Sequence, residues 1–295
     1  MLEGVTRRRL PGASSEVELA LLDWGGEGEL VVLHHANGFC AATLAPVAKR
    51  LSDRFHVISI DARGHGDSTS VPPKGEPNPY AWETLAKDLQ HALGEMLALT
   101  GRDRIALGIG HSFGGALLLR TAVEDPGLFD RLLLCDPVLR PAPTPEELAE
   151  RANPNPLVHA TRKRRDRFPS RQAAFEHCRT RGLFREFRPE TLALYVGEGM
   201  RETSEGEVVL KCDREVEAAI FDVGGSSEAI EAVETASAEV VFVHAGRGNF
   251  SRDYFDTLAA GMSRARVIGL NAGHLFPLEE PETVLQLVEE MMSNA

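Results

Sequence analysis

The sequence of 295 residues has few cysteines and no spacing that would pair them. Cys40, Cys135, Cys178 and Cys212 are scattered along the chain, and no C-x-x-C pair occurs. A zinc site and a disulfide framework both need closely and regularly spaced ligands or partners. The pattern excludes both, and it predicts reduced thiols in a cytoplasmic protein.

Long apolar runs and an excess of positive charge are also missing. No run approaches the roughly 18 apolar residues of a membrane span. The basic Met1–Arg9 stretch has no apolar segment behind it, so we expect no signal peptide here. Lysine and arginine number 32 against 44 acidic residues, which gives a formal net charge of -12. Because phosphate binding needs a basic surface, nucleic acid is not expected as a partner.

What is present is an alternation of short apolar runs with segments of helical spacing. Such an alternation predicts an α/β fold with a parallel sheet, because a strand covered on both faces is apolar throughout. The chain is long enough for one large domain or two smaller ones. The expected strands are 16–22, 29–34, 55–60, the run before residue 110, 132–135, 239–244 and 265–270; the expected helices include 45–51, 80–99 and 281–292.

The middle of the chain differs from the rest in its composition and in its pattern of apolar residues. Prolines cluster between 141 and 156, and charged segments of helical character follow without a clear buried strand. We therefore predict an α/β core over 1–139 and 223–295, with a mostly helical cap over 140–222. The basic block 162–167 is interpreted as a solvated face of the cap, the alternative being an anion site. Aromatic and methionine side chains of the cap are candidates for its own core or for an apolar pocket: Phe168, Phe175, Phe184, Phe187, Tyr195 and Met200.

One short motif carries the chemistry. Gly110-His111-Ser112-Phe113-Gly114 fits G-x-S-x-G, in which a serine lies on a tight turn between a buried strand and a helix. Glycines suit the two flanking positions because the backbone passes close to itself there. The helix points its N-terminus at the serine, where backbone N–H groups can receive a developing oxyanion. The alternative is a glycine-rich turn with a capping serine.

A serine nucleophile needs a base and a carboxylate that orients the base. His274 follows the last predicted strand, at the same sheet edge as Ser112, and is the predicted base. Asp136 follows the next strand after the helix that begins beside Ser112, and it gives the order Ser–acid–His along the chain. Its alternative role is a cap before Pro137. Asp253 and Asp256, after the strand at 239–244, are the rival acids.

The remaining site residues are expected near the same edge. The backbone N–H groups of Phe39 and Phe113 are the predicted oxyanion donors. His35, Asn37 and His111 are expected to contact the substrate, with a structural role as the alternative. Histidines gather here, but no spacing such as H-E-x-x-H accompanies them, and no metal is expected.

Taken together, the motifs resemble the α/β-hydrolase superfamily. The resemblance is carried by segments in the order of that family: His35–Phe39, Asp61–Ser68, Gly110–Gly115 and Ala272–His274. It implies an eight-stranded, mostly parallel sheet, a cap after the sixth strand, Ser112 as nucleophile, His274 as base and no cofactor. Two positions depart from the family pattern: Asn249 stands where an aspartate is common, and His35-Ala36 replaces a His-Gly pair.

The sequence therefore predicts a serine hydrolase that cleaves a carboxylic ester or related acyl bond of a small molecule. A hydrolase-like ligand receptor is the alternative from another class. Among enzymes, a thioesterase, a lactonase or a carbon–carbon bond hydrolase would use the same residues, because the pocket and not the sheet sets the substrate. The oligomeric state is not encoded in any pattern that we recognise.

Overall fold

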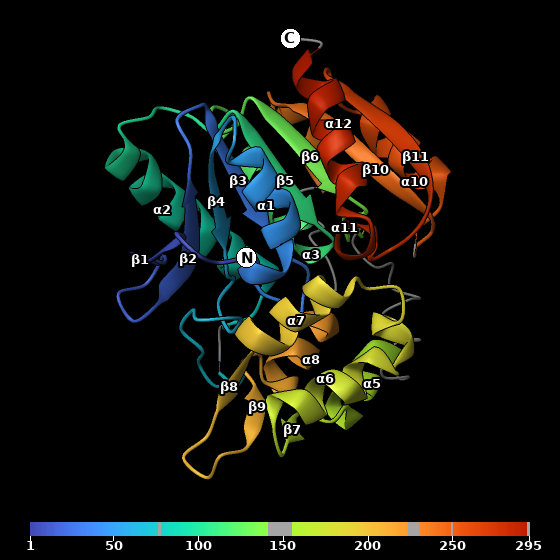
Figure 1. The fold of residues 1–295 in the computed structure, drawn as a ribbon. Helices are drawn as coiled ribbons and strands as arrows, with labels where there is room; N and C mark the ends of the chain where they lie inside the picture. The colour runs from blue at the N-terminus through green and yellow to red at the C-terminus, as the bar shows by residue number, and fades with distance from the viewer. Residues whose placement is uncertain (76–77, 141–154, 224–229, 249, 294–295) are drawn as a thin grey trace.

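An eight-stranded sheet forms the centre of the fold (Figure 1). We describe it from a computed structural model, over residues 1–75, 78–140, 155–223, 230–248 and 250–293. In spatial order the strands are β1 (Thr6–Pro11), β2 (Glu18–Gly25), β4 (His56–Ile60), β3 (Leu30–His34), β5 (Leu107–His111), β6 (Arg131–Cys135), β10 (Glu239–Arg247) and β11 (Ala265–Gly273). All neighbours are parallel except the two pairs that β2 makes, with β1 and β4. The predicted mostly parallel sheet is confirmed.

Helices cover both faces of this sheet, which explains why its central strands are apolar throughout. Every residue of β3 and β5 is buried. One face packs against α2 (Trp82–Thr100), α3 (Phe113–Glu124) and α10 (Arg252–Ala260), the other against α1 (Ala45–Leu51) and α12 (Pro281–Ser293). The short α11 (Phe276–Glu279) precedes α12. A parallel sheet between two helical layers leaves one open edge for a site, at the carboxyl ends of the strands.

The first strand, β1, was not predicted. Its residues Arg7, Arg8 and Arg9 are exposed, so no apolar alternation marks it as a strand. Their charges are balanced by acids on other elements: Arg7 contacts Asp67 and Glu198, and Arg8 contacts Asp23. β1 is an edge strand, and Leu10 is its one residue that packs into the core.

Residues 155–223 form a second layer, here called the cap layer, beside the carboxyl ends of the strands (Figure 1). It contains α5 (Pro156–Lys163), β7 (Arg167–Phe168), α6 (Arg171–Arg179), α7 (Pro189–Glu198), β8 (Met200–Glu202), β9 (Val208–Leu210) and α8 (Arg214–Val223). The three short strands pair as β7-β9-β8 and were not predicted, because two or three residues give no readable alternation. Residues 141–154, where the predicted cap begins, lie outside the described residues.

The four cysteines are buried, and each has a free thiol. Within the described ranges, no helix combines the length and apolar character needed to cross a membrane.

Candidate active site

Ser112 occupies the turn between β5 and α3, with its side chain at the open edge of the sheet. Its backbone is left-handed, at φ 56° and ψ −116°, a conformation that costs energy for a residue with a side chain. Ser112 N–H donates to Cys135 O, so the turn is fixed to β6. A Cβ on Gly110 would lie 2.5 Å from the Gly115 backbone, so the strand and the helix can cross this closely only at a glycine.

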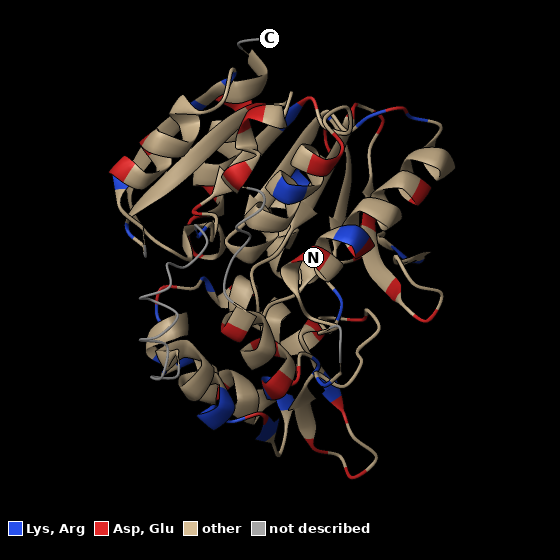
Figure 2. Ribbon diagram, turned by 180° about the vertical axis from the view of Figure 1, so that it is seen from behind, with Lys and Arg blue, Asp and Glu red and all other residues tan. Residues whose placement is uncertain are grey.

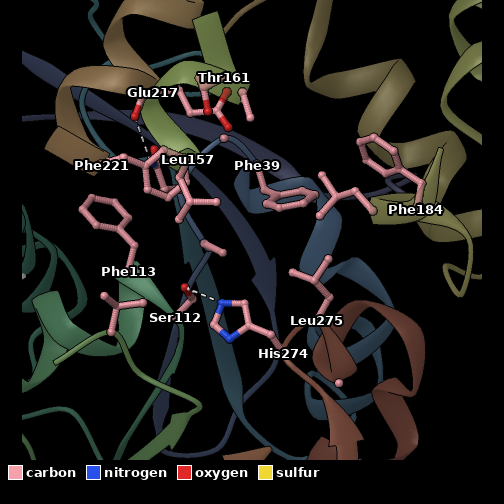
Figure 3. A pocket seen from close by; sticks show the side chains of 18 of the residues that line it. Phe39, Ser112, Phe113, Leu157, Thr161, Phe184, Glu217, Phe221, His274 and Leu275 are labelled. Atoms are coloured by element: carbon pink, nitrogen blue, oxygen red, sulfur yellow. Dashed lines mark hydrogen bonds between the residues drawn. The ribbon is translucent and has the colours of Figure 1, made fainter. Parts of the chain in front are cut away.

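His274 follows β11 and faces this serine (Figure 3). Ser112 Oγ lies 2.9 Å from His274 Nε2, and His274 Nδ1 lies 2.6 Å from Asp136 Oδ2. With Nδ1–H donated to the carboxylate, Nε2 is free to accept the serine proton. The three residues come from distant parts of the sequence and form one continuous chain of hydrogen bonds.

Asp136 is the carboxylate that meets His274, and its surroundings fix it there. It is fully buried after β6, its N–H donates to Val243 O, and its Oδ1 accepts from Ala245 N–H at 3.2 Å. A Cβ at Gly248 would lie 2.4 Å from its Oδ2. Backbone groups of β10 and of the turn after it therefore hold the carboxylate.

The rival acids lie elsewhere. Asp253 and Asp256 are exposed on α10, and both oxygens of Asp256 accept from Arg252. Neither carboxylate has a hydrogen bond to His274. Asn249, the position that departs from the family pattern, lies outside the described residues.

The two predicted oxyanion donors differ in whether their backbone N–H groups already have a hydrogen-bond acceptor. The Phe113 N–H, at the start of α3, finds no acceptor among the described residues. The Phe39 N–H instead donates to Ala36 O at 3.1 Å, inside a tight turn. The Asn37 N–H in the same turn has no acceptor within the described part of the chain. Phe113 and Asn37, and not Phe39, therefore have uncommitted N–H groups beside Ser112 in the cavity lining.

His35 and His111, which we expected to contact substrate, are both buried and do not line the cavity. His35 Nδ1 donates to Ala36 O at 2.8 Å, and its Nε2 accepts from Ala62 N–H at 3.0 Å. His111 Nε2–H donates to His274 O at 2.8 Å and so fixes the backbone of the base. The expected contact with substrate is therefore corrected to a structural role for both histidines. Each is buried and forms hydrogen bonds with backbone groups of neighbouring segments.

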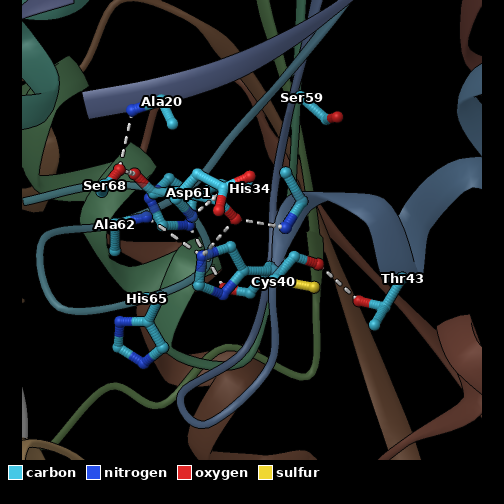
Figure 4. Close-up of polar contacts among 12 residues, drawn as sticks. Ala20, His34, Cys40, Thr43, Ser59, Asp61, Ala62, His65 and Ser68 are labelled. Atoms are coloured by element: carbon cyan, nitrogen blue, oxygen red, sulfur yellow. Dashed lines mark hydrogen bonds and ion pairs between the residues drawn. The ribbon is translucent and has the colours of Figure 1, made fainter. Parts of the chain in front are cut away.

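Burial keeps these histidines neutral. It lowers the pKa of His111 to about 3, and those of His34 and His65 to about 4. Neighbouring Asp61 accepts N–H bonds from Ala41 and Asp67, while burial raises the pKa of its carboxyl to about 6 (Figure 4). Among the described residues no three histidine, cysteine or acidic side chains converge as metal ligands.

A cavity of about 930 Å³ opens over Ser112, between the sheet edge and the cap layer. Phe39, Phe113 and Leu275 line it from the core, and Phe184 from the cap layer (Figure 3). The remaining cap candidates Phe168, Phe175, Phe187 and Met200 are not among its lining residues and belong to the neighbouring core. Asn37 lines the cavity, and its Nδ2 donates to Glu217 O across to the cap layer.

Polar residues of the cap layer also reach this cavity, and no sequence pattern marked them clearly. Basic segments gather on the helices of the cap layer, interspersed with acidic ones (Figure 2). Arg162 and Arg167 of the basic block are exposed and pair with acids, in agreement with a solvated face. Arg164 is different: it turns inward, lines the cavity and binds Glu217. An anion site was the alternative interpretation of the basic block, and Arg164 belongs to that block. Nothing in the sequence distinguishes Glu217 from other glutamates on an amphipathic helix.

A serine on a strand–turn–helix elbow, facing a histidine after the last strand of this sheet, is the arrangement of the α/β-hydrolase fold. The sequence profile described as the Alpha/beta hydrolase family matches residues 31–287. The chain belongs to this family.

Individual relatives match shorter stretches. Protein phosphatase methylesterase 1 of Schizosaccharomyces pombe is 33% identical over 102 residues, or 33% of this chain and 29% of that protein. The sn-1-specific diacylglycerol lipase ABHD11 of Danio rerio is 34% identical over 128 residues, or 42% and 37%. The matched part is thus less than two fifths of either relative. The crystal structure of E-2-(acetamidomethylene)succinate hydrolase aligns over 98% of this chain and 99% of that chain, with a TM-score of 0.76 and 19% identity, and shares the fold.

Proposed function

We propose that the chain is a serine hydrolase that cleaves a carboxylic ester or related acyl bond of a small molecule. The observation that carries the proposal is the unbroken series of hydrogen bonds from Ser112 Oγ through His274 to the buried Asp136. It lies at the floor of a cavity large enough for a small-molecule substrate. The names of the matched relatives include a methylesterase and a lipase, both of which denote ester cleavage.

The geometry suggests a two-stage reaction. Ser112 Oγ attacks the carbonyl carbon while His274 Nε2 takes the hydroxyl proton, and Asp136 stabilises the imidazolium that forms. The oxyanion accepts from the N–H of Phe113 and from an N–H of the turn 36–39, for which Asn37 has the uncommitted proton. Collapse of this intermediate breaks the ester bond, and the leaving alcohol takes the proton from His274.

The second stage releases the acyl group. Water enters, gives a proton to His274 Nε2 and attacks the acyl carbon of the acyl-enzyme. Collapse returns the proton to Ser112 Oγ and frees the carboxylic acid. The predicted cap serves in this proposal to select the substrate, through those of its described residues, within 155–222, that line the cavity.

The test is turnover of a p-nitrophenyl ester by the protein and by its Ser112→Ala variant. We expect many turnovers per molecule for the unaltered chain, and a loss on the order of 10⁴-fold or more in kcat for the variant. Circular dichroism would show that the variant folds. A single slow acylation without turnover would instead indicate a ligand receptor, and full activity of the variant would refute Ser112 as nucleophile.

A further inference from the structure

Three polar side chains of the cap layer meet in the wall of the cavity: Arg164 after α5, Tyr195 on α7 and Glu217 on α8. Arg164 donates to Glu217 Oε2 at 2.6 Å and to the Tyr195 hydroxyl at 2.8 Å. Tyr195 is 2% exposed and Glu217 is 6% exposed. Tyr195 and Glu217 are therefore withdrawn from bulk solvent, the Arg164 side chain is 22% exposed, and all three line the space that a substrate would fill.

Not every hydrogen-bonding position of this cluster is used. Within the described residues, the Tyr195 O–H proton has no acceptor, the Arg164 Nε–H has none, and Glu217 Oε1 has no donor. Arg164 Nε and Glu217 Oε1 are not among the fully buried unpaired atoms, so both keep accessible surface in residues that line the cavity. Polar groups in this position usually bond to a ligand or to water. The cluster offers both donors and an acceptor toward the cavity.

The cluster also borders the turn beside Ser112. A Cβ on Gly38 would lie 2.6 Å from Glu217 Oε1, the Asn37 side chain donates to Glu217 O, and the rings of Phe39 and Tyr195 are 5.5 Å apart. Any substrate that extends from the serine toward the cap layer along this turn passes these groups. The rest of that path is largely aromatic and aliphatic.

We propose that Arg164, Tyr195 and Glu217 form a subsite that recognises a neutral group with both a hydrogen-bond acceptor and a donor, such as a carboxamide or a hydroxyl. The Arg164 charge is already balanced by Glu217, so a substrate carboxylate would bring a second negative charge against Glu217. A plain alkyl group would cover the unpaired Tyr195 and Glu217 atoms without bonding to them. This inference deepens the proposed ester hydrolysis and rests on it.

The test uses two ester series, and each series compares three end groups. Carboxamide, carboxylate and isopropyl ends have the same number of heavy atoms and a similar size, and in the first series each is placed on two to six methylenes of the acyl chain of a p-nitrophenyl ester. A parallel series carries the end group on the alcohol of a butyrate ester. In at least one series we expect kcat/KM for the carboxamide to exceed that of both isosteres tenfold or more.

Two variants separate recognition from packing. Tyr195→Phe removes only a hydroxyl, and we expect it to reduce the carboxamide-over-isopropyl ratio at least fivefold. Glu217→Gln leaves the Arg164 charge unbalanced, so the carboxylate-over-carboxamide ratio should rise at least tenfold. A purely structural cluster would move neither ratio. Tyr254→Phe is the matched control, since its hydroxyl has no partner among the described residues and lies outside the cavity lining.

The proposal is overturned if the isopropyl or carboxylate ester is preferred in both series, or if both variants keep the unaltered ratios. Failure of the proposed function looks different: no ester is turned over. Binding of hexanamide to the Ser112→Ala protein, measured by calorimetry, then decides the subsite alone. Saturable binding weakened fivefold by adding Tyr195→Phe supports it, and absent or unaltered binding overturns it.

Discussion

Asp136 is fixed both by its backbone and by the hydrogen bonds of its carboxylate. Its backbone is left-handed at φ 44°, a conformation that aspartate adopts more readily than most residues. Its side chain has no exposed surface, and Ala245 N–H and His274 share the carboxylate. The residue therefore fixes the orientation of the histidine ring and favours the tautomer with a proton on Nδ1.

This arrangement predicts a large effect of Asp136→Asn. An amide in place of the carboxylate would favour the wrong tautomer of His274, so kcat should fall on the order of 10⁴-fold. Steady-state ester hydrolysis measures the loss. Asp253→Asn, which changes an exposed acid on α10, is the matched control and should leave kcat unchanged. Equal losses in the two variants would contradict the assignment of the acid.

Individual site residues differed in how far the sequence could predict them. Ser112 and His274 stood out because the elbow motif and the strand pattern put both at one sheet edge. Asp136 was the predicted acid but kept two rivals, since the choice depends on which strand end lies beside the histidine loop. Glu217 had no signal at all, because its burial arises only when α8 packs over the turn 36–39. The hydrogen bond from Phe39 N–H to Ala36 O likewise depends on the shape of that turn.

At the level of elements, the loop after β4 is tied to the helix α2 by a buried ion pair. Arg63 donates to both oxygens of Asp88, at 2.7 and 2.9 Å, and also to Pro79 O. Asp88 is 1% exposed, so its charge has little contact with water. The pair therefore anchors the segment 61–68, whose residues pack beneath the site.

Breaking this pair should be costly. Arg63→Gln would leave the Asp88 carboxylate buried without its cation, and we expect the free energy of unfolding to fall by about 3–5 kcal/mol. Urea denaturation measures the change. Lys87→Gln removes an exposed pair with Glu83 on the same helix and should leave the stability unchanged within error. A comparably small effect of Arg63→Gln would show that the loop is held by other contacts.

Elements buried on both sides were the predictable ones. The apolar runs of β3, β4, β6 and β10 reflect helices on both faces of the sheet, so each gives a clear pattern. The strand β1 gives none, because its arginines face outward and find their acids on distant segments. The short strands of the cap layer are set by pairing between segments, which no local pattern encodes.

At the level of the whole molecule, four buried histidines link folding to pH. Burial lowers the pKa values of His34, His65 and His111, and it holds that of His35 well below 6.5. Because these folded values lie below the unfolded value, the stability that they contribute is present above pH 6.5. It is lost as the pH falls from 6.5 to about 4. Asp61 acts in the opposite direction, since its raised pKa makes the folded chain hold a proton between pH 3.8 and about 6.

We therefore expect the stability to fall steeply in mild acid. Around pH 5 unfolding takes up protons at the four histidines and releases protons at Asp61 and at Glu217, whose pKa burial also raises. The net uptake of two to three protons corresponds to roughly 3–4 kcal/mol per pH unit. Urea denaturation at half-unit steps from pH 7 to 5 measures the slope. His34→Gln should reduce this slope by the contribution of about one proton, or roughly 1.4 kcal/mol per pH unit. A flat profile over this interval would contradict the neutral, buried state of these histidines.

The central claim is that the Ser112 hydroxyl, activated by His274, attacks the substrate. Labelling with a fluorophosphonate probe, followed by peptide mass spectrometry, tests it most directly, because the probe traps the attacking oxygen. The account predicts one adduct per chain, on Ser112, and none in the His274→Ala protein over the same time. An adduct on another residue, or ester turnover that continues without any adduct, would contradict it.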